Sequence, residues 1–216
     1  MTVAYIAPFL VYIGLLQLGR TLGIPAPLVY CAELLVVGLV LAVFSRPVIS
    51  LRPRQPLASV GIGVLVFVVW IAPDLLFHYR HSWLFDNFLT GSAASSLPPD
   101  LRHSPAFVVL RTVTSAGLVP ILEELFWRAW LMRWLIRTDF EKVPLGTYAP
   151  QAFWVVAVLF AAEHGPYWEV GLAAGIVYNW WMIRTHNLAD CILAHAVTNA
   201  VLSAYVLIAG QWQYWL

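Results

Sequence analysis

Seven stretches of the chain are rich in apolar residues, and short polar or proline-containing segments separate them. A helix needs about 20 apolar residues to cross the hydrocarbon layer of a bilayer. The pattern therefore predicts an all-α fold, a polytopic membrane helical bundle with about seven to eight transmembrane helices, and a single integral membrane domain over residues 1–216. The predicted spans are 5–18, 28–44, 57–72, 106–138, 151–163, 170–183 and 188–209.

The fourth stretch, 106–138, is longer than one membrane span requires. A helix of this length must tilt, break near Gly117 or Pro120, or divide into two elements, because proline lacks a backbone donor and glycine weakens a helix. The hydrophobic pattern leaves these three alternatives open.

Two of the connections have a distinct character. Residues 45–56 form a basic segment interrupted by prolines, which deny helix continuation. Residues 74–104 form the longest polar interval, and within it the apolar run from Trp83 to Leu89 is a candidate for a short helix at the membrane interface. We expect this interval to be the sizeable loop outside the membrane.

The composition supports a membrane protein and argues against nucleic-acid binding. Hydrophobic residues make up 61% of the chain and charged residues 11%, whereas a soluble domain carries about a quarter charged residues. The formal net charge is only +1, and the arginines are scattered rather than arranged along one face. We therefore expect the lipid bilayer as a partner and no nucleic acid.

The basic residues are distributed unequally between the two sides of the predicted bundle. Strict alternation of the spans places one larger and one smaller group on opposite sides, and the larger group is expected to face the cytoplasm. The N-terminus would then be inside and the C-terminus outside. The larger group is Arg46, Arg52, Arg54, Arg133, Arg137, Lys142 and Arg184, and the smaller group is Arg20, Arg80 and Arg102.

The chain also carries features typical of a prokaryotic protein. Its basic residues are almost all arginine, and no targeting extension precedes the first predicted span. The expected location is therefore the inner (cell) membrane of a prokaryote, as a multi-pass protein.

Three charged residues, Glu123, Glu124 and Arg128, interrupt the fourth apolar stretch. An ionisable side chain at this depth costs roughly 2.5 to 3.5 kcal/mol, so it normally faces a protein interior or a wet cavity. Glu124 and Arg128 are four residues apart and can pair on one helical face, whereas Glu123 points about 100° away. Glu123 is thus suited to accept a proton, and the alternative is an ion pair beside a carboxylate that pairs with another helix.

Two further polar groups occur near or within later apolar stretches. His164 precedes Gly165-Pro166, a step that should end the helix and open the backbone, although a histidine at a helix end is often only a cap. His195 and Asn199 share one helical face and can donate two hydrogen bonds to one oxygen. The alternative for this pair is hydrogen bonding between helices.

Together these residues resemble the motifs of one family. Glu123-Glu124 with Arg128, then Phe160 with His164, then His195 with Asn199, follow each other on separate apolar segments. In this order they resemble the CPBP family, the CAAX protease and bacteriocin-processing enzymes also called Abi. The resemblance covers residues 106–205, which would be the catalytic core.

This resemblance implies an intramembrane endopeptidase that hydrolyses a peptide bond of a membrane-associated protein or peptide. Glu123 with His164 would activate water, His195 with Asn199 would stabilise the oxyanion, and Glu124 with Arg128 would support the site. A membrane-anchored or lipidated protein or peptide is the expected substrate. The preferred mechanism needs no cofactor, and the alternative is a metal mechanism with zinc bound by Glu123, His164 and His195.

A different class of function also accounts for buried polar residues. A non-catalytic membrane scaffold, or a proton-coupled transporter, would use the polar cluster for helix packing or proton relay. Glu33 and Asp190 would be natural further members of such a relay. The chain shows no inverted repeat and no matching pair of broken helices, which speaks against transport.

Overall fold

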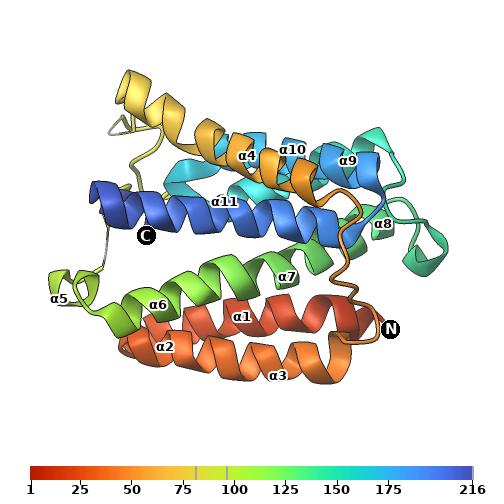
Figure 1. Cartoon of the computed structure of the whole chain (residues 1–216), viewed down its shortest axis with the longest axis horizontal. Coiled ribbons are helices and arrows are strands. Elements are labelled where there is room, and N and C mark those ends of the chain that lie inside the picture. Colours follow the sequence, from red (N-terminus) through yellow and green to blue (C-terminus); the bar gives the residue numbers. More distant parts are fainter. Residues whose placement is uncertain (81, 96, 216) are drawn as a thin grey trace.

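The computed structural model describes residues 1–80, 82–95 and 97–215, and its regular structure within them is helical. Each predicted apolar stretch forms a helix, so the expected all-α bundle is confirmed (Figure 1). The first four segments are α1 (Thr2–Leu22), then α2 (Ala26–Ala32) continuing through π-helical turns and α3 (Gly38–Val40) to Ser45, then α4 (Pro56–Phe77), and the short α5 (Pro99–Arg102). The later ones are α6 (Pro105–Val113), α7 (Val119–Glu124), α8 (Met132–Trp134), α9 (Pro150–Ala162), α10 (Trp168–Thr185) and α11 (Leu188–Ala209).

In the described part of the chain, five helical segments are long and apolar enough to cross a membrane by length and composition. They are Thr2–Leu22, Ala26–Ser45, Pro56–Phe77, Pro105–Trp134 and Leu188–Ala209. α9 is apolar but shorter, with 13 residues, and α10 has 18 residues and carries more polar side chains. The chain is therefore an integral membrane protein, in which α9 and α10 pack against each other and α10 packs against α4.

The long fourth stretch is one continuous helix from Pro105 to Trp134, neither broken nor divided. α6, α7 and α8 follow each other without interruption through two π-helical stretches, Thr114–Leu118 and Leu125–Leu131. The first of these lies directly before Pro120, where a regular α-helix would meet a ring clash and a missing donor. The wider π turns let the backbone pass this proline, and they leave carbonyl groups available to other partners.

The helices form two groups that meet along α7 and α11 (Figure 1). α4 and α10 pack on α11, and α9 packs on α10, while α1 and the α2–α3 segment pack on the other side of the long helix. α4 and α11 approach most closely at Gly63, where an added Cβ would lie 2.4 Å from the Ala194 carbonyl oxygen. Only glycine permits this approach, and it brings His195 and its neighbours toward the centre of the bundle.

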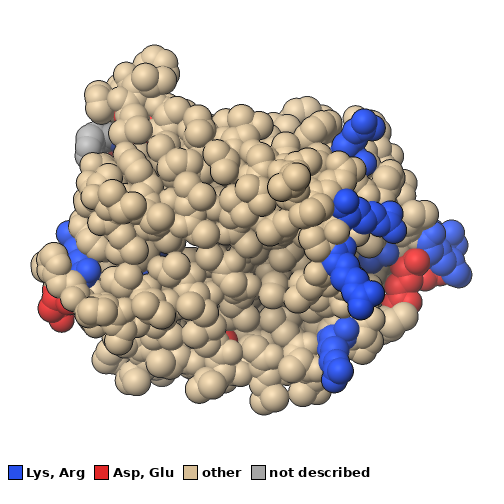
Figure 2. Space-filling model, viewed as in Figure 1, with Lys and Arg blue, Asp and Glu red and all other residues tan. Residues whose placement is uncertain are grey.

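The surface divides into an apolar belt and two charged ends. Large apolar side chains are exposed along α1, α2 and α4, as expected of helices that face lipid. Figure 2 shows a largely uncharged middle, with Lys and Arg side chains gathered at one end. At this end, α4, α9 and α11 begin and α8 and α10 finish. The larger group of basic residues was predicted to lie on this side of the bundle.

The short helix proposed for Trp83 to Leu89 is not present. These residues form turns with an isolated bridge between Asn87 and Gly91. The Asn87 side chain accepts hydrogen bonds from the backbone N–H groups of Leu89 and Thr90 at 2.8 and 3.1 Å. This local bonding competes with helix formation, and for this reason the prediction was wrong.

Candidate active site

The four residues expected to be catalytic line one cavity of about 130 Å³ inside the bundle. Glu123 comes from α7, His164 from the turn after α9, and His195 and Asn199 from α11. Three separate parts of the chain thus contribute polar groups to one enclosed space.

Glu123 lies in the last turn of α7 and is only 8% exposed. Its Oε2 atom is buried and has no hydrogen-bond partner among the described residues. The Nε2 atom of His195 lies 4.0 Å from this oxygen. This carboxylate oxygen is therefore able to bind a small molecule such as water within the cavity.

Glu124 and Arg128 form the ion pair predicted from their spacing. Arg128 Nη1 donates to Glu124 Oε1 at 3.1 Å, and both side chains are fully buried. Arg128 Nε donates to Asn179 Oδ1 at 3.1 Å, and Asn179 Nδ2 donates to the Phe153 carbonyl at 2.8 Å. The guanidinium also lies 4.4 Å from the centre of the Phe160 ring. This chain of bonds links the long helix to α9 and α10.

His195 lies between the two glutamates. Its Nδ1 is 2.9 Å from Glu124 Oε1, and its ring stacks on Tyr178 with the centroids 5.1 Å apart. Because Glu124 is paired with Arg128, it accepts at this oxygen, and His195 Nδ1 carries the hydrogen. The opposite ring nitrogen then faces Glu123 and the cavity.

Asn199 is held by the first π-helical stretch of the long helix. Its Nδ2 donates to the Ser115 carbonyl at 2.7 Å. An amide nitrogen has two N–H groups, so this bond uses one of them and orients the other. The irregular backbone before Pro120 thus positions a side chain on α11 that lines the cavity.

His164 follows the end of α9, as the Gly-Pro step predicted. Its Nδ1 is 2.6 Å from the Phe160 carbonyl, which can only accept, so Nδ1 carries the hydrogen and Nε2 is an acceptor. Its ring packs against Phe160 and Trp70, with centroids 4.6 and 5.2 Å away. The histidine is therefore fixed in one tautomer, in which Nε2 can accept a hydrogen bond.

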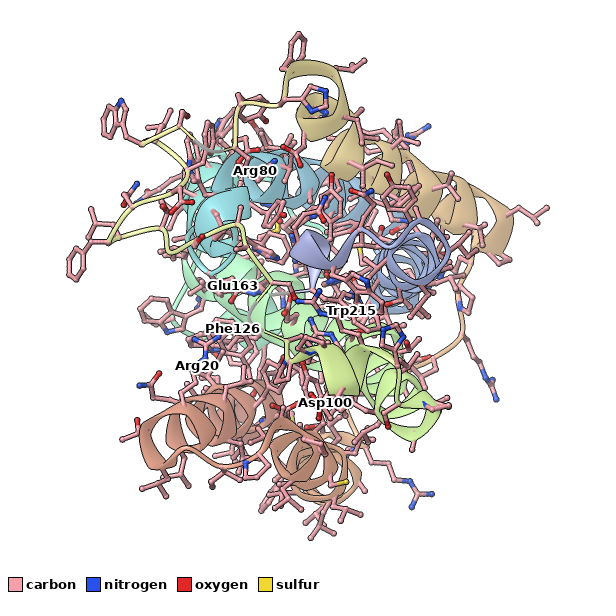
Figure 3. The ribbon with its side chains drawn as sticks, turned by 90° about the vertical axis from the view of Figure 1, so that its left-hand side faces the viewer. Arg20, Arg80, Asp100, Phe126, Glu163 and Trp215 are labelled. Atoms are coloured by element: carbon pink, nitrogen blue, oxygen red, sulfur yellow. The ribbon has the colours of Figure 1, made fainter. Side chains whose placement is uncertain are left out.

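The turn after His164 is clamped by Arg80, which is 2% exposed (Figure 3). Its Nη1 donates to the Pro166 carbonyl at 2.6 Å, and its Nη2 pairs with Glu169 at 2.7 Å. The guanidinium lies 4.1 Å from the centre of the Tyr167 ring. The loop after α4 thereby holds the segment that carries His164.

Gly165 lets this loop approach the histidine turn. Its φ is +53°, in the left-handed region that favours glycine. A Cβ at this position would lie 2.9 Å from the Thr90 carbonyl oxygen of the loop. The residue before Pro166 therefore has both a conformational and a steric reason to be glycine.

Sequence reasoning missed Asn179 and the role of Arg80. Asn179 is fully buried on a helix that was predicted only as a span, and an asparagine in such a stretch was the available signal. Arg80 was assigned only to the less basic side of the membrane. Nothing in the pattern connects it with residues 166 and 169, because the contact depends on how a loop folds back.

The zinc alternative requires its three expected ligands, Glu123, His164 and His195, to gather around one point. Among the described residues, no group of three His, Cys, Asp or Glu side chains is placed to hold a metal ion. Glu123 and His195 are 4.0 Å apart, and His195 Nδ1 is engaged with Glu124.

The two residues expected in a proton relay lie apart from each other. Asp190 accepts from the backbone N–H groups of Arg54 and Gln55 and from the Ser59 hydroxyl, at 2.9 to 3.0 Å. It thus stabilises the start of α4. Glu33 is fully buried, and its carboxylate oxygens have no hydrogen-bond partner among the residues that the structure describes. Within the described part of the chain, no hydrogen bond joins the two.

A family described as Rce1-like, type II CAAX prenyl endopeptidase, matches residues 105–201. The matched segment contains Glu123, His164, His195 and Asn199. No curated protein and no solved structure matches the chain.

Proposed function

We propose that the chain, whose residues 105–201 match the Rce1-like family of type II CAAX prenyl endopeptidases, is a member of that family and that Glu123 and His164 are its water-activating groups. The observation that supports this most directly is the shared cavity with Glu123, His164, His195 and Asn199 in its wall. A buried carboxylate oxygen without a partner and an imidazole fixed as an acceptor are what activation of water needs.

The proposed reaction begins with a water molecule between Glu123 and His164. Glu123 takes a proton from the water as its oxygen attacks the carbonyl carbon of the substrate peptide bond. The carbonyl oxygen gains negative charge and accepts hydrogen bonds from the second N–H of Asn199 and from the Nε2–H of His195, which acts in this step as the imidazolium and donates from Nδ1 to Glu124 as well. The C–N bond then breaks, and Glu123 returns its proton to the leaving amine.

Glu124 and Arg128 support this reaction without touching the substrate. Glu124 accepts from His195 Nδ1 and thereby directs Nε2 toward the cavity. Arg128 compensates the Glu124 charge at full burial, where an unpaired carboxylate would be costly. Both side chains thus keep His195 in the orientation that the oxyanion requires.

The proposed substrate is a membrane-associated protein or peptide, lipidated or anchored by its own segment. The exposed apolar belt supports a cavity at the level of a bilayer, and we infer that the substrate reaches it from the membrane. We place the protein in the inner membrane of a prokaryote with the basic end in the cytoplasm. The turn of His164 is then near the opposite, external side.

The test is peptide cleavage by the purified protein in lipid nanodiscs, with an apolar peptide library and mass spectrometry as the readout. Glu123→Gln is expected to lower the rate by about 10² to 10⁴, the usual contribution of a general base. Asn199→Leu is expected to lower it by about 10² to 10³. Glu141→Gln removes an exposed carboxylate and serves as the matched control.

Three outcomes would contradict this mechanism. Full activity of Glu123→Gln would exclude the glutamate base. Loss of activity after chelation, with bound zinc in the purified protein, would favour the metal alternative. Proton flux in liposomes without any cleavage would favour a transporter.

A further inference from the structure

The connection between the α2–α3 segment and α4, residues 45–56, crosses from one group of helices to the other at the basic end of the molecule (Figure 1). At its start the Ser45 hydroxyl donates to the Ala4 carbonyl at 2.6 Å. Near its end the backbone N–H of Arg54 donates to the Asp190 carboxylate at 3.0 Å. The connection is therefore held at both ends and forms a defined part of the surface.

Leu51, in the middle of this connection, lines two apolar hollows. The first has a volume of about 300 Å³, and its other walls include Ala42 of the second helical segment and Ile121 of α7. The second has a volume of about 190 Å³ and is closed by one face of α11, formed by Ala189, Ile192, Leu193 and Ala196. The hollows share Leu51 but have walls from different helices, so they lie on either side of this side chain, where the two groups of helices meet.

The sequence of the connection accounts for this arrangement. Residues 49–53 form neither helix nor turn, and Ile49, Leu51 and Pro53 all line the hollows. Every second side chain of an extended chain lies on the same side. Arg52, which falls between two of the lining residues, is exposed. The connection thus turns an apolar edge toward the hollows and a polar edge away from them.

The connection is also positively charged. It contains three arginines, Arg46, Arg52 and Arg54, and no acidic residue. All three are exposed, and no ion pair engages them among the described residues. Arg46 itself lines the first hollow. Figure 2 shows basic side chains in a row at this end of the molecule, so their charge is open to a partner.

Apolar hollows beside uncompensated guanidinium groups match the chemistry of one kind of molecule. Guanidinium groups bind phosphate through paired, charge-assisted hydrogen bonds, and apolar hollows bind hydrocarbon. An anionic phospholipid carries a phosphate next to two acyl chains, and basic pockets between transmembrane helices bind such headgroups. We propose that this connection binds one anionic phospholipid, with its phosphate on Arg46 and Arg52 and one acyl chain in each hollow beside Leu51.

The charge of the site selects an anionic lipid over a zwitterionic one. Phosphatidylcholine carries a quaternary ammonium group near its phosphate, which the three arginines repel, whereas phosphatidylglycerol carries no cation. An arginine near the membrane surface strengthens the binding of an anionic lipid about fivefold. Because the hollows have walls from α7 and α11, the bound lipid contacts both groups of helices and should stabilise their association.

The test is native mass spectrometry of the purified protein with phosphatidylglycerol and phosphatidylcholine of identical acyl chains. The wild type should bind phosphatidylglycerol about tenfold more tightly than phosphatidylcholine. Arg46→Gln combined with Arg52→Gln should lower the affinity for phosphatidylglycerol about tenfold or more and leave that for phosphatidylcholine unchanged. Arg137→Gln removes an exposed arginine that lines neither hollow and is the matched control.

The hollows are tested by a variant that leaves the charge unchanged. Ala42→Phe adds a ring to the wall of the first hollow and should lower the affinity for phosphatidylglycerol about threefold or more, because the acyl chain loses its place. Val43→Phe enlarges the next residue, which is 60% exposed and lines neither hollow, and is the control.

Thermal unfolding followed by tryptophan fluorescence provides an independent readout. Phosphatidylglycerol should raise the Tm of the wild type by about 2 to 4 °C once most of the protein holds a lipid. The double arginine variant should lose this shift, and Arg137→Gln should keep it.

Four outcomes would overturn the proposal. The first is equal affinity of the wild type for the two lipids, and the second is an unchanged preference in the double arginine variant. The third is equal affinity of Ala42→Phe and Val43→Phe for phosphatidylglycerol. The fourth is the same rise in Tm with inorganic phosphate, which would assign the arginines to a soluble anion.

Discussion

Two buried arginines, Arg128 and Arg80, each hold one of the site histidines, but in different ways. Arg128 is fully buried and pairs with Glu124, four residues earlier on the same helix, which in turn contacts His195. Arg80 comes from a loop and bonds to residues 166 and 169, next to the turn of His164. The first cluster is local in sequence, whereas the second joins distant segments.

The difference reflects the surroundings of the two clusters. Within the apolar layer no water can solvate a charge, so Arg128 must be compensated wherever the helix places it, and an i,i+4 partner does this reliably. At the end of the bundle, Arg80 also lies 3.4 Å from Asp74, which is partly exposed. Water can replace part of these contacts. We therefore expect the loop cluster, formed by Arg80, Asp74 and Glu169, to tolerate substitution better than the cluster around Arg128.

Arg128→Leu should have the largest effect on stability. It leaves Glu124 buried without its cation, which costs about 3 to 5 kcal/mol. The free energy of unfolding is measured by denaturant titration in mixed micelles, with tryptophan fluorescence as the signal. Arg137→Leu, at an exposed position near the end of the same helix, is the control. A loss no greater than in this control would remove the distinction between the clusters.

Asn179→Leu should have the next largest effect. It removes the acceptor for Arg128 Nε at a fully buried position, and a hydrogen bond to a charged group contributes about 1.5 to 3 kcal/mol. The same unfolding measurement applies. A change below about 0.5 kcal/mol, the range of neutral surface substitutions, would show that Arg128 does not depend on this bond.

Arg80→Met should affect activity more than folding. The turn after α9 loses its clamp, so we expect kcat to fall about tenfold through misplacement of His164, with little change in KM. Arg80→Lys, which keeps the charge near Glu169, should recover part of the loss. Arg102→Met changes another arginine of the same end and is the control. Equal kcat values for the Arg80→Met and Arg102→Met variants would contradict a positioning role.

The smallest effect concerns the alkaline stability of the loop cluster. Burial raises the pKa of Tyr79 to about 12, and its hydrogen bond to Glu169 adds to the rise. The stabilisation is complete below pH 10, and it is lost as the pH rises from 10 toward 12, because the unfolded tyrosine ionises first. At this partly exposed site the change should stay below ~1 kcal/mol. Tyr79→Phe should remove it, and an unchanged pH profile in that variant would contradict the assignment.

The sequence alone predicted the membrane bundle and the boundaries of its main helices. Long apolar runs can satisfy their backbone groups in lipid only as helices, so hydropathy is a direct signal of structure there. Motif order on the apolar segments also identified Glu123, His164, His195 and Asn199 as a group. The spacing of Glu124 and Arg128 predicted their pairing, because i,i+4 contacts are local.

The tertiary structure decided what depends on contacts between distant segments. It kept the long helix continuous past Pro120, since π-helical turns absorb the proline and Asn199 bonds to a carbonyl that these turns leave available. It also placed Asn179 beside Arg128 and placed Arg80 beside the turn that follows His164. The shared cavity also depends on contacts between distant segments. Its walls come from helices whose relative placement is set by close packing at sites such as Gly63. Periodicity along one chain specifies which face of a helix is polar, but only packing determines what that face meets.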